Sequence, residues 1–213
     1  MNKPLLIIGA GGHASVLVDI LRQQKREVIG IVSPEIDASK EIFQGICHYS
    51  NDDDVLNFAT DSIMLVNGIG SLPKSNLRAK IYDKFIRLGY KFSQVIASDV
   101  KISDFSELSD GAQVIHGVII QVGTIIGANT IVNTGAIIDH DCNIGMNNHI
   151  APGVTLSGQV KTEENVHIGT GASVIQSVFI GKNSVIGAGC TIVKSVDENV
   201  VCYPARITKK VIK

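Results

Sequence analysis

The sequence predicts a small α/β unit of the βαβ type followed by a parallel β-helix. In the first unit, a short apolar strand, a glycine-rich loop and an amphipathic helix follow one another directly. In the second, every sixth residue from Ile96 to Ile192 is aliphatic at sixteen of seventeen positions, without an insertion. A period of six fits neither a helical turn nor the two-residue alternation of a long strand. It is typical of short strands that stack coil upon coil.

Three hexads close one triangular coil of eighteen residues, so residues eighteen apart should stack. The aliphatic residue points inward, together with a smaller residue two positions before it, such as Ala136 or Cys142. Thr162 alone interrupts the aliphatic series, and we expect it to bulge one corner without changing the count. Asparagine tolerates the left-handed backbone angles of a tight corner. The asparagines expected at corners are Asn129, Asn133, Asn143, Asn147 and Asn183.

The N-terminal unit should begin with a strand at residues 5–8, a glycine loop at 9–14 and a helix at 15–24. A second strand at residues 27–32 completes this half of the βαβ unit. The glycines allow a ligand to approach the backbone closely, and the helix N-terminus offers free N–H groups to a phosphate. The loop matches a loose dinucleotide pattern, but Ser33 and Pro34 stand where an NAD site needs an acid. A nucleotide or phosphate site is therefore expected here, and NAD is disfavoured.

Further along the chain we expect a helix at residues 50–58, a third strand at 62–66 and a helix at 75–88 with Gly89 after its end. A second glycine loop, residues 67–71, follows the third strand. Ligands of parallel sheets bind outside the carboxyl ends of the strands, so both glycine loops should face one crevice. We expect residues 1–92 to form a nucleotide-sugar-binding domain and residues 93–213 to form the β-helix with a short C-terminal tail.

Composition narrows the class of protein. The formal net charge is −1 and the basic residues are scattered, which disfavours nucleic acid as a partner. No apolar run is long enough to span or insert into a membrane, and no signal peptide is apparent, so a cytoplasmic protein is expected. The cysteines lack CxxC or zinc-site spacing and read as reduced, packed thiols. They are Cys47, Cys142, Cys190 and Cys202.

A histidine between two acids is the most distinctive polar group of the β-helix. Asp139, His140 and Asp141 follow an inward-pointing isoleucine and should lie on a turn. A general base needs an exposed imidazole held in one tautomer, with a carboxylate that stabilises its charged form. Either acid could supply that carboxylate. A solvated polar corner is the alternative, but two acids on a scaffold with few charges favour catalysis.

Two further histidines, His149 and His167, are eighteen residues apart and should lie one coil above the other. A metal site would need a third ligand at matching spacing, but Val185 occupies the next position. We therefore expect a stacked histidine pair that lines a groove, and no metal site.

Together with the hexads, several short motifs resemble one family, the bacterial sugar-nucleotide acetyltransferases of the left-handed β-helix superfamily. That group includes bacillosamine-pathway and perosamine N-acetyltransferases and sialic acid O-acetyltransferases. The resemblance covers essentially the whole chain. The motifs are Gly9-Ala10-Gly11-Gly12-His13, Asn67-Gly68-Ile69-Gly70-Ser71, Arg78-Ala79-Lys80-Ile81-Tyr82, Asp139-His140-Asp141 and Tyr203-Pro204-Ala205-Arg206.

The resemblance implies a homotrimer with active sites between neighbouring β-helices and acetyl-CoA as the co-substrate. It places the catalytic base on His140, with Asp141 as its acid. The family's acetyl-CoA groove falls on His149, Thr170 and Ala188. The nucleotide sugar is assigned to the two glycine loops and their surroundings, and Asn133 is the candidate contact of the acceptor. The substrate-binding residues are thus expected to be Gly11, Gly12, His13, Ser33, Gly70 and Asn133.

The function expected from these features is N-acetylation of a nucleotide-linked amino sugar, a UDP-4-amino-4,6-dideoxy sugar, for surface glycan biosynthesis. A deprotonated amine can attack the acetyl thioester directly, so no enzyme nucleophile is needed, and none is evident. Sialic acid O-acetylation is the alternative within the same chemistry. A nucleotide-sugar-binding scaffold without catalysis is the alternative of another class. An NAD oxidoreductase comes last, because a β-helix has no role in hydride transfer.

Overall fold

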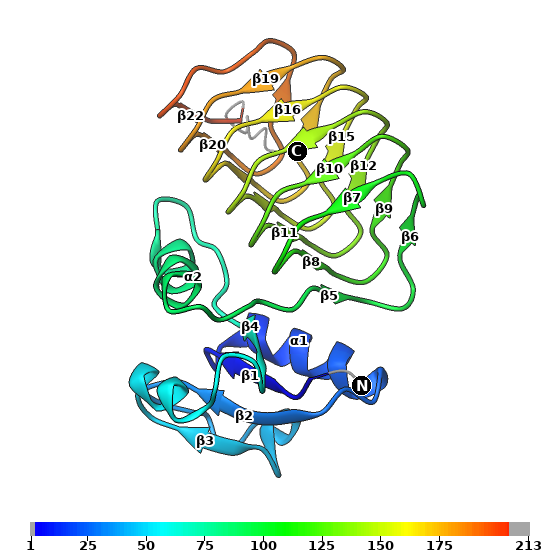
Figure 1. Ribbon diagram of the computed structural model, residues 1–213. Coiled ribbons are helices and arrows are strands. Elements are labelled where there is room, and N and C mark those ends of the chain that lie inside the picture. The colour runs from blue at the N-terminus through cyan, green and yellow to red at the C-terminus, as the bar shows by residue number, and fades with distance from the viewer. Residues whose placement is uncertain (1–2, 205–213) are drawn as a thin grey trace, which may run out of the picture.

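The computed structural model describes residues 3–204, so Ala205 and Arg206 of the C-terminal motif lie outside the described residues. The N-terminal unit is a four-stranded parallel sheet in the order β3-β2-β1-β4. Figure 1 shows this unit at one end of the column of coils formed by the rest of the chain. Its strands are β1 (Leu5–Ile8), β2 (Val28–Val32), β3 (Cys47–Tyr49) and β4 (Met64–Asn67). Its helices are α1 (Gly12–Gln23) and α2 (Leu77–Arg87), with 3₁₀ turns η1 (Glu41–Phe43) and η2 (Asp52–Asn57).

Two expectations for this unit need correction. The helix expected at residues 50–58 is the shorter 3₁₀ turn η2, which Asn51 and Asp54 hold through a reciprocal capping box. The strand expected at residues 62–66 is β4 rather than the third strand, because the short strand β3 precedes it. Strand β3 is a three-residue edge strand with two exposed residues, so it lacks the apolar alternation by which strands are recognised.

The second unit is the predicted β-helix, left-handed and built from two-residue strands in three flat sheets (Figure 1). We number these sheets first, second and third. The second sheet faces the N-terminal unit and contains β5 (Val95–Ile96), β8 (Gln113–Val114), β11 (Ile131–Val132), β14 (His149–Ile150), β17 (His167–Ile168), β20 (Val185–Ile186) and β22 (Val201–Cys202). The third contains β6 (Lys101–Ile102), β9 (Ile119–Ile120), β12 (Ile137–Ile138), β15 (Thr155–Leu156), β18 (Ser173–Val174) and β21 (Thr191–Ile192). The first contains β7 (Glu107–Leu108), β10 (Ile125–Ile126), β13 (Asn143–Ile144), β16 (Lys161–Thr162) and β19 (Phe179–Ile180).

The eighteen-residue stacking is confirmed, since Ile125 pairs with Asn143 and Asn143 with Lys161. The aliphatic and small series both point inward and form one continuous buried core. Asn129, Asn147 and Asn183 adopt left-handed angles at corners, as expected. Asn143 was placed wrongly, because it lies within β13 rather than at a corner. Asn133 follows β11 without a left-handed angle.

The bulge expected at Thr162 is absent, because the residue pairs regularly with Ile144 and Ile180. Its hydroxyl is buried and accepts hydrogen bonds from the side-chain amide of Asn148 and the backbone N–H of Gly145. Asn148 belongs to the inward small series and is itself buried. The hexad exception is therefore one half of a polar pair inside the prism.

Replacing Thr162 by Val should destabilise the fold although valine fits the hexad better. The substitution removes the acceptor of the buried Asn148 amide, and an unsatisfied buried polar group costs about 1–3 kcal/mol. Denaturant unfolding measures the change. Thr191→Val, an exposed position in β21, is the control and should change the free energy of unfolding by about 0.5 kcal/mol or less. Equal stability of Thr162→Val and wild type would contradict the assignment of this pair.

The two units meet along the β5 and β8 edge of the second sheet. Phe92 still bridges to Leu65 of the N-terminal sheet, and Val95 begins β5. We therefore keep residues 92 and 93 as the proposed boundary between domains. Within residues 3–204, every helix is too short or too polar to cross a lipid bilayer.

Candidate active site

His140 lies at the corner between β12 and β13, where the chain turns from the third sheet to the first. Its Nδ1 and Asp141 Oδ2 are 2.8 Å apart. A carboxylate only accepts, so Nδ1 carries the hydrogen and the lone pair of the ring lies on Nε2. The imidazole is half exposed and can be reached from solvent. The corner therefore presents one basic nitrogen in a fixed tautomer.

The two flanking acids have different tasks. The pKa of His140 is raised above its ordinary value, chiefly by the hydrogen bond to Asp141, with smaller contributions from the charges of Asp139 and Asp141. Asp139 instead accepts from the backbone N–H of His140, 2.8 Å away, and so holds the turn. The sequence did not decide which of the two acids orients the imidazole. The hydrogen bonds show that Asp141 does so.

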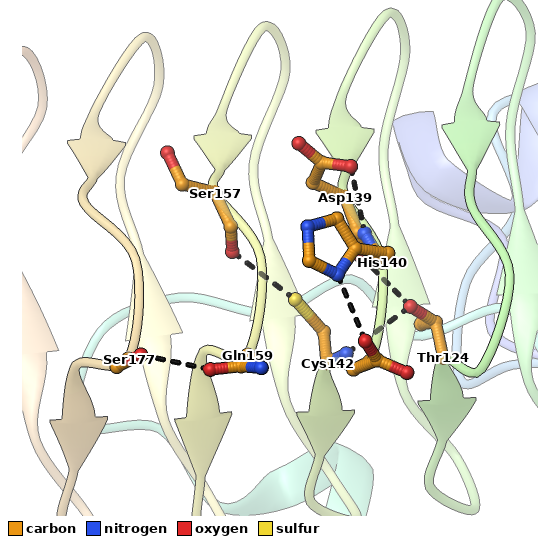
Figure 2. A network of polar contacts seen from close by, with 8 residues as sticks. Thr124, Asp139, His140, Cys142, Ser157, Gln159 and Ser177 are labelled. Atoms are coloured by element: carbon orange, nitrogen blue, oxygen red, sulfur yellow. Dashed lines mark hydrogen bonds and ion pairs between the residues drawn. The ribbon is translucent and has the colours of Figure 1, made fainter.

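Residues of the neighbouring coils support this turn from inside the prism (Figure 2). The buried hydroxyl of Thr124 donates to the carbonyl of Asp139 and accepts from the N–H of Cys142. The Cys142 thiol faces the carbonyl of Ser157, and burial raises its pKa to about 11. The thiol is therefore protonated near neutral pH, consistent with a packed cysteine rather than a nucleophile.

Two glycines make room for the histidine and its acid. Gly158 lies eighteen residues after His140, and a Cβ added there would approach His140 Nε2 to 2.5 Å. Gly123 lies eighteen residues before Asp141, and a Cβ added there would collide with the carboxylate. The backbone angle of Gly158 is one that other residues adopt, so only the imidazole above it requires glycine. Neither glycine was singled out from the sequence.

The first glycine loop ends at Gly11, which is the N-cap of α1, and Gly12 begins the helix. Both glycines are exposed, and a Cβ added to either would meet no atom within 4 Å. Packing therefore does not demand glycine at these positions, whereas a ligand that approaches the helix N-terminus would. Ser33 follows β2 at the same carboxyl edge of the sheet.

His13 joins the glycine loop to the β-helix. Its Nε2 lies 2.7 Å from Gln113 Oε1, while Gln113 Nε2 donates to the carbonyl of Asn67. The glutamine orientation makes His13 Nε2 the donor and leaves Nδ1 as an acceptor. Burial and the nearby Arg78 lower the pKa of His13 to about 4, so the ring is neutral. A Cβ on Gly70 would lie 3.4 Å from that of His13, so the two glycine loops lie side by side.

The predicted histidine stack is confirmed: the rings of His149 and His167 are 4.8 Å apart between centroids and 19° from parallel. The Nδ1 atom of each ring is buried without a hydrogen-bond partner in the described chain. Burial lowers the pKa of His149 to about 3, so its ring is neutral. Within residues 3–204, no group of three or more His, Cys, Asp or Glu side chains is arranged to hold a metal ion.

The remaining predicted residues lie at a different corner from His140. Thr170 and Ala188 follow β17 and β20 and stack, with the Gly189 N–H donating to the carbonyl of Thr170. Asn133 follows β11 at this same corner, and its Oδ1 accepts from the Thr134 N–H. In one chain, β12 separates Asn133 from His140, so the structure does not bring the acceptor contact and the base together.

Comparisons with known proteins agree with this architecture. The PglD N-terminal domain family matches residues 4–85. The structure of PerB from Caulobacter crescentus, in complex with CoA and GDP-perosamine, is 31% identical, with a TM-score of 0.84, 97% of this chain and 98% of that one being covered. The acetyltransferase domain of PglB from Neisseria gonorrhoeae, in complex with acetyl coenzyme A, is 26% identical, with a TM-score of 0.85 and coverage of 97% and 99%. No curated protein sequence matches the chain.

A third similar structure is WeeI from Acinetobacter baumannii, at 23% identity, a TM-score of 0.75 and coverage of 94% and 96%, which supports the fold. The chain thus belongs to the sugar-nucleotide acetyltransferase family of left-handed β-helix proteins. The predicted class of enzyme, an acyltransferase that uses acetyl-CoA, is confirmed with it.

Proposed function

We propose that this enzyme transfers the acetyl group of acetyl-CoA to the amino group of a nucleotide-linked amino sugar destined for a surface glycan. The hydrogen-bonded pair of His140 and Asp141 carries the proposal, because it is a poised general base on an exposed corner. The relatives support the acceptor class, since PerB is crystallised with GDP-perosamine. Two further structures of the perosamine N-acetyltransferase carry a histidine replaced by asparagine or alanine. The sugar predicted from the sequence is a UDP-4-amino-4,6-dideoxy sugar.

In the proposed reaction, Nε2 of His140 accepts a proton from the amine as its nitrogen forms a bond to the acetyl carbon. The C–S bond then breaks, and the departing sulfur takes up a proton, which returns His140 to its neutral form. Asp141 stabilises the imidazolium in between, and Asp139 keeps the turn in place. The products are the N-acetylated sugar nucleotide and free CoA, and the proton count balances without a metal.

Release of free CoA thiol from acetyl-CoA tests the proposal against a panel of acceptors. The panel holds UDP- and GDP-linked 4-amino sugars and free and CMP-linked sialic acid. Release with an amino-sugar nucleotide is the expected result and identifies the nucleotide. Release with sialic acid alone would replace the proposal by O-acetylation. If no acceptor caused release of CoA but the protein still bound a nucleotide sugar, the result would favour a binding scaffold without catalysis.

The carboxylate of Asp141 should set the pH dependence of turnover. The base must be neutral, so kcat/KM falls as pH drops through the pKa of His140, which the hydrogen bond to Asp141 raises. In Asp141→Asn this acidic limb should move to lower pH, while the plateau rate also falls because the imidazolium loses its partner. Asp139→Asn is the matched control and should move the limb much less. An unchanged limb in Asp141→Asn would contradict the assigned pair.

Gly11 should mark the nucleotide end of the crevice. Gly11→Val should raise KM for the nucleotide sugar about tenfold or more and leave acetyl-CoA binding unchanged, because the new side chain occupies the open space before α1. Calorimetry with each substrate separates the two effects. The fold should tolerate the change, since Gly11 has ordinary extended angles. Equal loss of both affinities would contradict a nucleotide site at this loop.

We propose that the complete site forms between subunits of a homotrimer. Asn133 and the groove residues His149, Thr170 and Ala188, which we assign to acetyl-CoA, do not meet His140 within one chain. The exposed Ile137 of β12, stacked on Ile119, gives the intervening face an apolar surface suited to a second copy. At a nucleotide-sugar concentration well below the raised KM of Gly11→Val, co-expressed His140→Ala and Gly11→Val chains should be more active than either variant alone. Failure to recover activity would place the site within one chain.

A further inference from the structure

A concave site borders the regions assigned above, because Ser71 of the second glycine loop and His167, whose ring stacks on His149, both line it. It has a volume of about 360 Å³ and lies between the loop that joins β4 to α2 and the corners that precede β14, β17 and β20. Its walls contain two cationic side chains, Lys74 and Arg78, and no Asp or Glu. The residues assigned individually to substrate, acetyl-CoA and catalysis do not line it, although their neighbours Ser71 and His167 do. The pocket therefore adjoins the proposed substrate regions and has a positive charge balance.

The N-terminus of α2 opens into this pocket. Ser75, Asn76 and Ala79 lie on its wall, and Asn76 is the N-cap residue. The side chain of Asn76 makes no capping hydrogen bond, and the first turn contains no acid. The first N–H groups of a helix have no partner inside the helix and carry a partial positive charge. A ligand that accepts hydrogen bonds would complete this end of α2.

Arg78 adds a buried charge that has no counter-ion. The residue is 5% exposed, and its Nε and Nη1 donate only to the backbone carbonyls of Asn67, Ile69 and Asn129. No carboxylate pairs with it in the described chain, and its Nη2 has no hydrogen-bond partner there. Burial lowers the pKa of Arg78 to about 9, which still leaves it charged at neutral pH. Because a buried charge without a counter-ion is costly, an anion nearby would stabilise it.

A relay of side-chain amides delivers a further donor to the pocket. Asn67 Nδ2 donates to the carbonyl of Arg78 and to Asn129 Oδ1, which fixes its orientation. Asn129 Nδ2 then donates to Asn147 Oδ1, so the N–H groups of Asn147 Nδ2 are available to donate to a ligand. The asparagine column is broken at this point: Asn165 bonds to Asn183, but no hydrogen bond joins Asn147 to Asn165 in the described chain. The relay thus ends in a free donor on the pocket wall.

We propose that this pocket binds an anion of the phosphate class. The N–H groups of α2, the amide of Asn147 and the flexible Lys74 supply the donors, and Arg78 supplies charge from behind the wall. Every one of these groups donates, and no acid competes for them. Phosphate oxygens accept several hydrogen bonds at once and favour helix N-termini. Free phosphate and the phosphates of the two substrates share this chemistry, and binding and kinetic measurements distinguish these sources.

Inorganic phosphate is the probe for the site itself. The Tm of the full chain should rise saturably with phosphate when chloride holds the ionic strength constant, because binding to the folded state stabilises it. Asn147→Asp should weaken the apparent affinity about tenfold or more by placing a negative charge on the wall. The new carboxylate still accepts from Asn129 and tolerates the left-handed angle of this residue. Asn143→Asp, on the exposed face of β13, is the matched control and should behave as wild type.

Each outcome of the phosphate titration supports or overturns the site. No saturable rise in the wild-type protein would overturn the proposal. A rise that survives in Asn147→Asp would also overturn it, since phosphate at the glycine loop of α1 would then suffice. Loss of the rise in both variants would show an effect of net charge alone, with the same consequence. The measurement involves no turnover, so its failure is independent of the function proposed above.

Steady-state kinetics identify the source of the phosphate and do rest on the proposed function. A higher KM for acetyl-CoA in Asn147→Asp, absent when the acetyl donor is acetyl-dephospho-CoA, would assign the site to the 3′-phosphate. A higher KM for the nucleotide sugar alone would assign it to the pyrophosphate. Unchanged KM values together with lost phosphate binding would identify a free anion.

Discussion

His140→Ala should lower kcat by about 10²–10⁴-fold, the usual contribution of a positioned general base. The substitution removes the imidazole whose tautomer is fixed by its hydrogen bond to Asp141. The imidazole is half exposed, so its loss should leave the fold and the affinities for both substrates almost unchanged. Single-turnover release of CoA, with calorimetry of each substrate, separates catalysis from binding. Turnover near that of wild type would exclude His140 as the base.

Gly158→Ala should lose most of the activity that His140→Ala loses, although no contact with substrate is assigned to residue 158. The methyl group would lie 2.5 Å from His140 Nε2, so the ring must rotate away from the position in which Asp141 holds it. The backbone at residue 158 suits alanine, so Tm should change little. The loss should appear in kcat rather than in KM.

A double-mutant cycle tests whether Gly158 acts through the histidine. In the His140→Ala background, Gly158→Ala should cause almost no further loss, because no ring remains to be displaced. Independent, multiplying losses would mean that Gly158 has a role of its own, such as contact with the acceptor. A wild-type rate in Gly158→Ala would show that the ring has another catalytically competent position.

Much of the β-helix was predictable because aliphatic residues recur at every sixth position and no insertion changes this count. The expected bulge was wrong, because Thr162 keeps the register and forms a buried pair with Asn148. Strand β3 could not be predicted, since three residues on an exposed edge carry no apolar alternation. Local pattern identifies repeating elements well and isolated ones poorly.

The candidate catalytic corner was predictable in part. The sequence identifies His140 and its two acids, but only the hydrogen bonds assign the ring to Asp141 and the turn to Asp139. Gly158 could have been found by counting eighteen residues onward from His140. The contacts of Gln113 and Arg78 could not have been predicted in this way. They form where the two units pack against each other, and the period of the β-helix does not extend to that contact.

The fixed spacing of the coils also determines which changes in chain length the protein can accept. In most domains an extra loop residue is absorbed locally. Here, one residue added within a strand of the column would turn every later aliphatic side chain outward until the count is restored. Insertions should survive only where they loop out at a corner, and deletions only as whole eighteen-residue coils. Because the proposed base, His140, lies in the middle of the column, a change in the number of residues between it and Thr170 or Ala188 should displace the proposed catalytic corner from the proposed acetyl-CoA groove.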